Sequence, residues 1–405
     1  MKCFRLSLLT CLVLSATGSQ YANAAAFQFY ELGAPIIGTA AVGQASVAQD
    51  ASISYYNPAA MPSLQSSQFL LGAQPVLTYT NFTPNSSNTI SGNNGSNAGG
   101  FLAGVDGYYV YQYSPKLNFG VSLTMPYGGS LAYDNHWVGR YNVQQMLLYT
   151  LNLNPSVGYQ VNDWFSFGGG IAIEYANLYQ TVAIPISPTT DGQATVKFDN
   201  VSPGFNLGVL LTPYSTTRIG VAYRSQIVHQ LRGNASFLNT SIVPSANSKL
   251  VMPANIIASL SQKINDQWTM LGELGWSNWS TMRNTTVTVS GFSAVTPANW
   301  NNTYRVGLGT QYQLSHATLW QVGISYDSSP TTTSKRSPAL PMDGQTRVGT
   351  GVIYRLAQAV NLGVSYEYMH LGKAAISNTS ASGVLSGSYS RNYANVVQAS
   401  LNVDC

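Results

Sequence analysis

The sequence predicts an all-β fold, a 14-stranded antiparallel transmembrane β-barrel with an N-terminal plug, or hatch. Three observations predict it. Apolar and polar residues alternate along most of the chain, which is typical of strands with one apolar and one polar face. Charged residues make up only 8% of the 405 residues, whereas soluble domains carry roughly 25%. A secretion signal precedes the alternating stretches, so we expect apolar faces toward lipid and polar faces toward a lumen.

The composition disfavours two other classes of protein. A mean hydropathy of +0.01 is too low for a bundle of membrane-spanning helices. A soluble array of β-sandwiches is the alternative, but it fits the low charge poorly. Closed barrels, in contrast, satisfy every strand backbone group in lipid. No run of basic residues indicates a nucleic-acid partner.

Residues 1–24 have the form of a signal peptide. Lys2 and Arg5 are basic, residues 6–16 are apolar, and Ala22-Asn23-Ala24 is a cleavage site of the A-x-A type. We therefore expect export, cleavage after residue 24, and insertion into the outer membrane of a Gram-negative bacterium.

Residues 25–66 do not alternate and form the predicted plug. They are rich in Gly and Ala and end in a proline-containing stretch that includes Asn57-Pro58-Ala59. Prolines argue against central barrel strands. A barrel of many more than eight strands leaves a lumen to fill, so we favour a plug over a compact segment in the periplasm. The Asn-Pro turn would hold the plug against the wall, and an ordinary turn is the alternative.

Residues 67–405 form the predicted barrel. Tight connections such as Ser315-His316 alternate with long ones such as 280–302, which is the pattern of short periplasmic turns and long outer loops. An even number of strands returns the C-terminus to the periplasm. The fourteen predicted strands are 67–80, 103–114, 117–127, 141–160, 163–183, 194–213, 216–235, 248–264, 267–279, 303–314, 318–327, 344–356, 358–370 and 392–403.

Four short motifs follow one another along the chain. They are Ala25-Ala26-Phe27-Gln28, Trp137-Val138-Gly139-Arg140-Tyr141, Gly275-Trp276-Ser277-Asn278-Trp279-Ser280 and Tyr326-Asp327-Ser328-Ser329-Pro330. With these motifs, a plug ending in Asn57-Pro58-Ala59 and fourteen strands, the mature chain resembles the FadL/TodX family of outer-membrane transporters. That family carries long-chain fatty acids and other hydrophobic compounds.

The resemblance implies passive transport of hydrophobic small molecules without a cofactor. Long-chain fatty acids are the first expectation and aromatic hydrocarbons the second. The resemblance also implies that the N-terminus moves and that a gap at a kinked third strand releases the ligand sideways into the outer-membrane lipids. A monomer, inserted by the barrel-assembly machinery, is expected.

The third predicted strand ends in a candidate kink. Pro126 cannot donate a hydrogen bond to the ladder, and Gly128 and Gly129 follow it. An ordinary strand end is the alternative, because Pro and Gly also mark turns. The predicted gate and plug residues are Asn57, Pro58, Ala59, Pro126, Gly128 and Gly129.

Candidate ligand-binding residues come from the N-terminus, the outer loops and the lumen face. N-terminal aromatic side chains would reach the lumen, although a free N-terminus can also fray. Arginines alternate with apolar neighbours and should face the lumen, because a charge facing lipid costs roughly 2–4 kcal/mol. Most should pair with one another or with Glu31 and Asp50, and a minority could hold a ligand carboxylate. The candidates are Phe27, Phe29, Tyr30, Leu131, Trp137, Arg218, Arg305 and Arg347, and Arg224 and Arg355 share the inward phase.

The C-terminus departs from the family pattern. The chain ends in Asp404-Cys405 instead of the terminal Phe that the barrel-assembly machinery usually reads. Cys405 keeps the outward position of the alternating pattern. It is also the one cysteine left after cleavage, which excludes an internal disulfide.

Other functions have weaker support in the sequence. The four histidines lack metal-ligand spacing and no G-x-S-x-G element occurs, so we predict no enzyme, no catalytic residue and no metal site. A general diffusion porin for small hydrophilic solutes is the main alternative, and it would have a charged constriction and no plug. A structural or adhesive surface barrel is the third reading.

Overall fold

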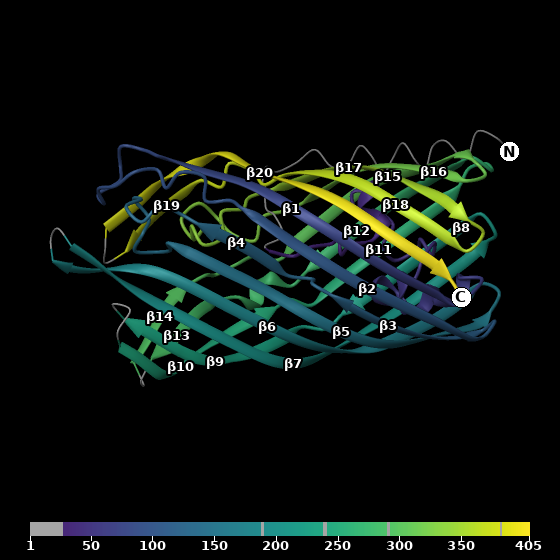
Figure 1. Cartoon of the computed structure of the whole chain (residues 1–405), viewed down its shortest axis with the longest axis horizontal. Coiled ribbons are helices and arrows are strands. Elements are labelled where there is room, and N and C mark those ends of the chain that lie inside the picture. Colours follow the sequence, from purple (N-terminus) through teal and green to yellow (C-terminus); the bar gives the residue numbers. More distant parts are fainter. Residues whose placement is uncertain (1–26, 188–189, 238–240, 290–291, 381–382) are drawn as a thin grey trace.

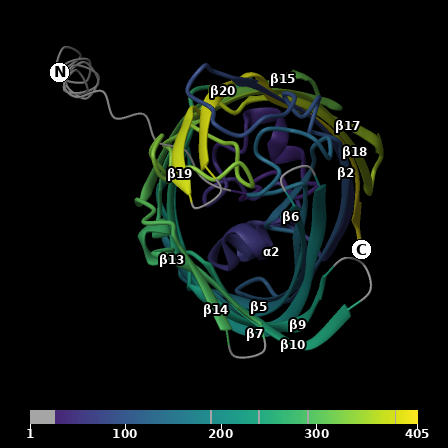
Figure 2. The same cartoon turned by 90° about the vertical axis from the view of Figure 1, so that its left-hand side faces the viewer.

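A computed structural model describes residues 27–405, with gaps at 188–189, 238–240, 290–291 and 381–382. The predicted signal peptide, residues 1–24, lies outside the described residues. The strands form one closed cylinder (Figure 1), and the view along its axis shows a helical segment within it (Figure 2). The predicted all-β barrel is confirmed.

Antiparallel strands of very different lengths build the wall. They are β1 (Gln68–Pro84), β2 (Phe101–Ser114), β3 (Leu117–Thr124), β4 (Gly128–Ala132), β5 (Gln145–Asn162), β6 (Phe165–Ser187), β7 (Thr190–Tyr214), β8 (Thr217–Arg224), β9 (Ile227–Phe237), β10 (Ser241–Met252), β11 (Asn255–Lys263), β12 (Trp268–Ser277), β13 (Asn284–Val289), β14 (Phe292–Pro297), β15 (Thr303–Ser315), β16 (Thr318–Asp327), β17 (Gln345–Ala357), β18 (Val360–His370), β19 (Ile376–Ser380) and β20 (Gly383–Asp404). A short 3-10 turn, η3 (Trp279–Thr281), follows β12.

Fourteen wall strands, each a full crossing of the cylinder, close the barrel. Several crossings consist of two strands in series, for example β3 with β4 and β10 with β11. β1 pairs with β2 on one side and with β20 on the other, so the two ends of the sheet meet. Closure removes the open sheet edge that lipid could not satisfy.

Three of the predicted wall strands are interrupted in the structure. The predicted third strand ends at Thr124 and resumes as β4 at Gly128. The predicted strand 216–235 is divided at 225–226 between β8 and β9, and the predicted strand 248–264 is divided at 253–254 between β10 and β11. Alternation resumes after the breaks at 225–226 and 253–254 with its phase shifted by one residue, so that buried positions change from even-numbered (Ala222, Ser248) to odd-numbered (His229, Ser259).

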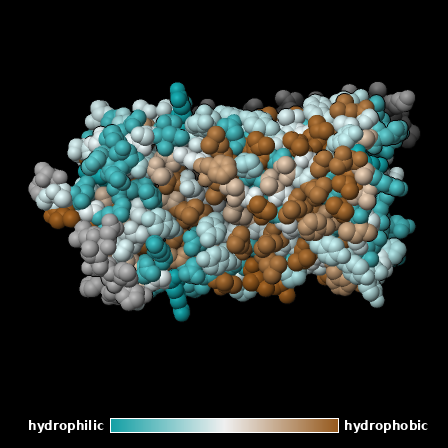
Figure 3. All heavy atoms as spheres, in the orientation of Figure 1, coloured by the Kyte–Doolittle hydropathy of each residue, from teal (hydrophilic) through white to brown (hydrophobic). Residues whose placement is uncertain are grey.

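The alternating pattern sorts side chains between lipid and lumen. On β20, Leu401 is 39% exposed and the neighbouring Asn402 only 4%. On β18, Val364 is 58% exposed and Ser365 only 3%. Apolar residues accordingly form a broad band on the face of the barrel shown in Figure 3. None of the helices in the described part of the chain is long and apolar enough to cross a membrane.

Residues 27–66, which we call the inner segment, lie inside the cylinder (Figure 2). The segment contains η1 (Pro35–Thr39), α2 (Ile53–Tyr56) and η2 (Pro58–Ser63). η1 packs on β15 to β18, and η2 packs on the opposite side on β5 to β7. The segment occupies the half of the lumen nearest the short turns, which is the periplasmic half in barrels of this class.

Glycines on the inner face of the wall let the inner segment approach closely. A Cβ atom on Gly72 would lie 1.8 Å from the carbonyl oxygen of Gly33, and one on Gly220 would lie 1.8 Å from that of Ala45. Any larger residue would therefore displace the segment's backbone. We call the wall positions with this property the glycine ring, and its members are Gly72, Gly158, Gly168, Gly220, Gly323 and Gly349.

Candidate functional site

Apolar side chains line the lumen above the inner segment, toward the long loops. The lumen face is polar in the periplasmic half, so the change from polar to apolar side chains along the barrel axis marks a separate compartment. We call this group the outer cluster, and its larger members are Phe27, Tyr127, Leu148, Phe198, Ile227, Leu231, Leu250, Met252, Trp279, Met282 and Leu340. An apolar chamber is the environment that a hydrophobic ligand requires.

Three interrupted wall strands shape one side of the outer cluster. The breaks after β8, before β11 and after β12 lie at one level, because Asn255 is paired with both Arg224 and Ser277. Large side chains flank these breaks, and Met252 is paired with Ile227. Sequence analysis missed this arrangement, and one signal for it was Pro253 within an alternating stretch.

The N-terminal end of the inner segment pairs with the kink between β3 and β4. The Phe29 amide donates to the Pro126 carbonyl at 2.9 Å, and the Gly128 amide donates to the Phe27 carbonyl at 3.0 Å. Gln28 and Tyr127 form an isolated antiparallel bridge. Residues 27–29 therefore act as a short extra strand where the wall ladder is interrupted.

A small apolar cavity of 60 Å³ lies directly against this pairing. Phe27 and Phe29 line it, together with Gly128 and Gly129 of the kink. Leu131, Leu102, Leu340 and Met369 add to its apolar lining. Predicted gate residues and predicted ligand-binding residues thus meet at one place.

Phe27 holds a central position in the outer cluster. Its ring centroid lies 6.1 Å from that of Tyr127 and 5.3 Å from that of Trp279, in edge-to-face arrangements. The Trp300 ring lies 6.3 Å away. Phe27 therefore connects the kinked wall strand with the side of the wall where β12 ends, and edge-to-face pairs of this kind are worth about 0.5–1.5 kcal/mol beyond burial.

Trp137 lies apart from the cavity, in the core of the outer loops. Its ring stacks on that of Tyr133, with the two ring centroids 3.9 Å apart. Its indole nitrogen donates to the Val143 carbonyl at 2.7 Å. The Tyr133 hydroxyl is 2.7 Å from that of Tyr389. These contacts tie loops from opposite parts of the chain together over the barrel mouth, whereas Leu131 reaches the cavity.

Arg305 and Arg347 lie in a buried ionic network around Tyr30. Arg305 donates to Glu273 at 2.9 Å and to Asp327 at 2.7 Å. The two guanidinium carbons lie 4.3 and 5.1 Å from the centre of the Tyr30 ring. Cations over an aromatic face are attracted by its quadrupole. Tyr30 thus contacts the network rather than the apolar cavity.

Arg347 joins the same network to the inner segment. It donates to Glu31 at 3.0 Å and also bonds Asp327, and Glu367 lies 3.7 Å away. The prediction that lumen charges pair with one another and with Glu31 is therefore confirmed for these two arginines. Since their partners are carboxylates already, a ligand anion would have to compete for both.

Glu273 completes the network from the wall side. Its carboxylate accepts from the backbone amides of Gly43 at 2.9 Å and Gln44 at 3.0 Å. Charge-assisted bonds of this kind are the stronger hydrogen bonds in proteins. The inner segment is thus held by wall charges as well as by close backbone contact.

Arg218 is half-buried near the periplasmic end of β8, and within the described residues it forms no ion pair.

The turn Asn57-Pro58-Ala59 lies deeper, against β5 to β7. The Asn57 side chain donates to the Ala45 carbonyl at 2.7 Å and accepts from the Ala59 amide at 3.2 Å. The turn therefore fixes the inner segment to itself and to the wall.

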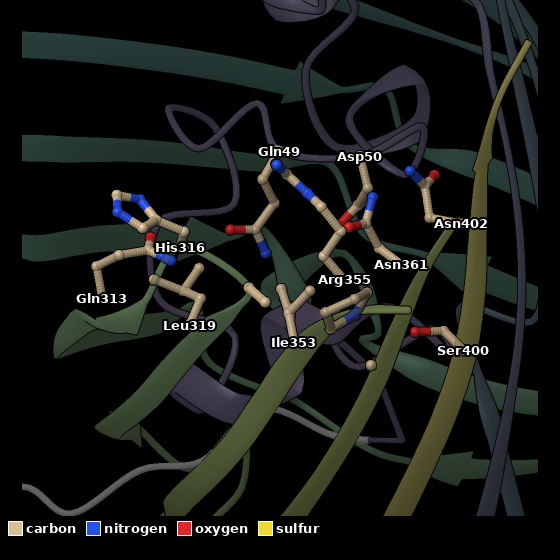
Figure 4. A pocket seen from close by; sticks show the side chains of 13 residues that line it. Gln49, Asp50, Gln313, His316, Leu319, Ile353, Arg355, Asn361, Ser400 and Asn402 are labelled. Carbon is tan, nitrogen blue, oxygen red and sulfur yellow. The ribbon is translucent and has the colours of Figure 1, made fainter. Parts of the chain in front are cut away.

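A second, polar cavity of 180 Å³ opens at the periplasmic end (Figure 4). Gln49 and Asp50 of the inner segment border it, opposite Arg355, Asn361 and Asn402 of the wall. Burial raises the pKa of the Asp50 carboxyl, against the hydrogen bonds from Ser52. In the described residues no group of three or more His, Cys, Asp or Glu side chains is placed to hold a metal ion.

Comparisons with known proteins give a consistent picture. The family model for outer membrane protein transport proteins (OMPP1/FadL/TodX) matches residues 15–404. A long-chain fatty acid transport protein of Escherichia coli is 26% identical over 399 residues, which cover 87% of this chain and 88% of the relative. Outer membrane protein P1 of Haemophilus influenzae is 26% identical over 420 residues, covering 91% and 90%.

Solved structures share the fold. The crystal structure of a Pseudomonas aeruginosa FadL homologue superposes with a TM-score of 0.88 at 20% identity, covering 94% of this chain and 100% of the other. The Pseudomonas putida toluene transporter TodX gives a TM-score of 0.70 at 15% identity, covering 94% and 99%. The barrel and its strand order are therefore those of a known outer-membrane architecture.

Proposed function

Because this chain belongs to the OMPP1/FadL/TodX family of outer-membrane transport proteins, we propose that it carries long-chain fatty acids passively across the outer membrane, with lateral release at the kinked wall strand. The family transports hydrophobic compounds and the chain is an outer-membrane barrel. The observation that carries the proposal is the N-terminal pairing with the kink, directly against an apolar cavity.

Fatty acids fit the apolar lining of the outer half. Relatives in Escherichia coli bear the name of long-chain fatty acid transport proteins, and each buried CH₂ contributes roughly 0.8 kcal/mol. Aromatic hydrocarbons, the ligands in the name of the toluene transporter, are the second candidate class for the same surface.

Ligand entry requires the N-terminus to move. The cavity measures 60 Å³, whereas sites for small molecules usually measure about 300–1,000 Å³. Phe27 and Phe29 occupy apolar space that an acyl chain would fill, so ligand and N-terminus compete for it. A ligand that binds only the state with a displaced N-terminus shifts the population toward that state.

Displacement of the N-terminus would open the wall. Residues 27–29 supply the backbone partners of Pro126 and Gly128, so their departure leaves the interrupted ladder unpaired. The ligand then passes between wall strands into the outer-membrane lipids, and it does not need to pass the inner segment. No covalent step is required, so the protein works without a catalytic residue or cofactor.

We assign residues 25–66 to a plug and 67–405 to the barrel, in a monomer delivered by the barrel-assembly machinery. The buried network of Arg305 and Arg347, and the glycine ring, support a plug that stays in place during transport. A filled periplasmic half disfavours the diffusion porin, which needs a water-filled path for hydrophilic solutes.

Uptake of labelled oleate by cells that lack their own transporter tests the proposal. The cells would express this chain or an Asn57→Ala/Pro58→Gly variant, with permeation of a small sugar as the control. Oleate uptake that falls in the variant, with no sugar entry through the wild-type chain, is expected. Sugar entry without oleate uptake would contradict the proposal and favour the porin.

A further inference from the structure

Arg224, at the end of β8, differs from the other deeply placed lumen arginines. Arg305 and Arg347 each contact two or more carboxylates, whereas within the described residues no ion pair joins Arg224 to an acidic side chain. A guanidinium carries five N–H donors and stays charged. In the described part of the chain, Arg224 thus places a cation without a direct ion pair between the inner segment and the outer cluster.

The contacts of Arg224 are with Tyr55 of α2. One nitrogen donates to the Tyr55 carbonyl oxygen, and the guanidinium carbon lies 3.4 Å from the centre of the Tyr55 ring. A carbonyl and an aromatic face are neutral partners. Because an anion would bind the same group more strongly than a neutral carbonyl does, Arg224 is open to exchange of partners.

Two cavities meet at Arg224. One of 20 Å³ lies on the side of the outer cluster and is lined by Tyr127, Ile227 and Met252. The other, of 30 Å³, lies on the side of the inner segment. A space of 20 Å³ holds about one water-sized group. It therefore suits a small polar head group whose apolar tail lies in the outer cluster.

Further polar atoms face the cavity beside the outer cluster. The Ser225 hydroxyl oxygen accepts from the Phe205 amide at 2.9 Å, which leaves its own hydrogen free to donate. Asn152 also lines this cavity, and its side-chain oxygen is buried without a partner. Unsatisfied polar groups of this kind are rare in protein interiors. The Ser225 hydroxyl can therefore donate to an anionic head group, whereas the Asn152 oxygen can only accept.

The one carboxylate in this cavity, that of Glu174, has its hydrogen bonds with residues other than Arg224. Glu174 accepts from the Asn152 amide at 2.9 Å and lies 3.2 Å from the His229 ring nitrogen. Both carboxylate oxygens of Glu174 thus have hydrogen-bond partners other than Arg224. Arg224 and the Ser225 hydroxyl remain as donors for a second anion.

We infer that Arg224 binds the carboxylate of an amphiphilic ligand while the acyl chain lies in the outer cluster. This inference rests on the proposed transport of hydrophobic molecules and makes it specific for ionised fatty acids over neutral hydrocarbons. The carboxylate replaces the Tyr55 carbonyl on the guanidinium. Ligand binding therefore also loosens one contact between the wall and the inner segment.

Equilibrium binding to the purified full chain tests the inference at a pH at which oleate is ionised. Labelled oleate and labelled oleyl alcohol, which has the same chain without the charge, are compared on wild type, Arg224→Gln and Ser225→Ala. Arg391→Gln, at an exposed position on β20, is the charge-matched control. Heat-modifiable migration on a gel reports whether each barrel is assembled.

Arg224→Gln should weaken oleate binding about 10-fold or more and change oleyl alcohol binding by less than about 2-fold. Ser225→Ala should show the same selectivity with a smaller loss, and it carries the test if Arg224→Gln does not assemble. Equal losses for both ligands, or no loss for either, would overturn the inference. Wild type that binds oleyl alcohol but not oleate would also overturn it and leave hydrophobic transport standing, whereas wild type that binds neither would contradict the proposed function itself.

Discussion

The two halves of the lumen hold their contents in different ways. In the periplasmic half, the inner segment is fixed by the glycine ring and by ion pairs such as Arg347 with Glu31 at 3.0 Å. In the outer half, the N-terminus is held by apolar rings and by three residues of backbone pairing at the kink. The first set of contacts is directional and hard to exchange, and the second can be replaced by any apolar molecule.

Under the proposed function, this difference separates two tasks within one barrel. A seal against water has to persist while ligands pass, and buried ion pairs are costly to break because they leave an unpaired charge. A ligand site has to fill and empty, and apolar contacts are non-directional. Changes in the periplasmic half should therefore let small hydrophilic solutes through, and changes in the outer half should alter hydrophobic uptake alone.

Removal of the Arg347 charge should have the largest effect on the seal in the periplasmic half. Arg347→Gln leaves Glu31 and Glu367 without their cation and Asp327 with Arg305 alone, and loss of one partner of a buried pair costs about 3–5 kcal/mol. We expect a lower unfolding temperature and entry of small sugars, measured by heat-modifiable gel migration and by swelling of liposomes. Arg391→Gln, at an exposed position on β20, is the control and should behave as wild type. An Arg347→Gln barrel that stays sealed would contradict the assignment of the seal to this half.

Truncation of Phe27 tests the outer half. Phe27→Ala removes the ring contacts to Tyr127 and Trp279, and loss of a buried Phe costs about 3 kcal/mol. Because the N-terminus then leaves the kink more readily, proteolysis near residue 27 should accelerate while sugar entry stays absent. Phe101→Ala, on a lipid-exposed ring, should leave both readouts unchanged. Sugar entry through Phe27→Ala would show that the two halves are not independent.

A side chain introduced at Gly208, between η2 and the wall, tests whether close backbone contact also contributes to the seal. A Cβ atom on Gly208 would lie 1.9 Å from the Asn57 side-chain oxygen, and overpacking of this kind costs about 1–3 kcal/mol. Gly208→Val should displace the Asn57 turn and admit small sugars while the barrel still assembles. Gly107→Val is the matched control, since a Cβ atom there meets no atom within 4 Å. Equal sugar entry through both variants would point to a general defect of the wall.

The smallest effect is expected at the kink itself. Pro126→Ala restores an N–H group to the wall, and one added hydrogen bond is worth about 1 kcal/mol, or roughly fivefold in a rate. Oleate uptake should slow by that factor without any change in sugar entry. Pro115→Ala, in a periplasmic turn, provides the comparison. Unchanged uptake would indicate that release does not pass through the interrupted ladder.

The barrel could be predicted from the sequence because period-two alternation is a local signal that repeats in every wall strand. The period of two does not by itself mark the breaks at 225–226 and 253–254, because alternation resumes after each of them. Only the phase changes there, since buried positions are even-numbered before the breaks, as at Ala222 and Ser248, and odd-numbered after them, as at His229 and Ser259. The outer cluster was missed as well. It arises where inward positions of distant strands are apolar rather than polar, and the pairing of Met252 with Ile227 is set by the register of two strands.

The sequence predicted individual site residues, but it did not predict which of them contact one another. Phe27 and Gly128 were named from separate arguments, and the structure brings them together through backbone pairing that no side-chain pattern encodes. Arg305 and Arg224 look alike in the sequence, because each alternates with apolar neighbours and is therefore predicted to face the lumen. Their difference depends on whether carboxylates from other strands reach the guanidinium, which is a property of the folded wall.

The glycine ring also has a consequence for the order in which the wall and the inner segment assemble. Its members come from the first wall strand, at Gly72, to the twelfth, at Gly349. The contact surface of the inner segment therefore does not exist until nearly the whole cylinder has formed. We therefore expect the segment, although it is synthesised first, to dock last, with the finished wall as its template. Closing contacts of such sequence separation is slow, and newly inserted barrels should leak to small solutes until docking is complete.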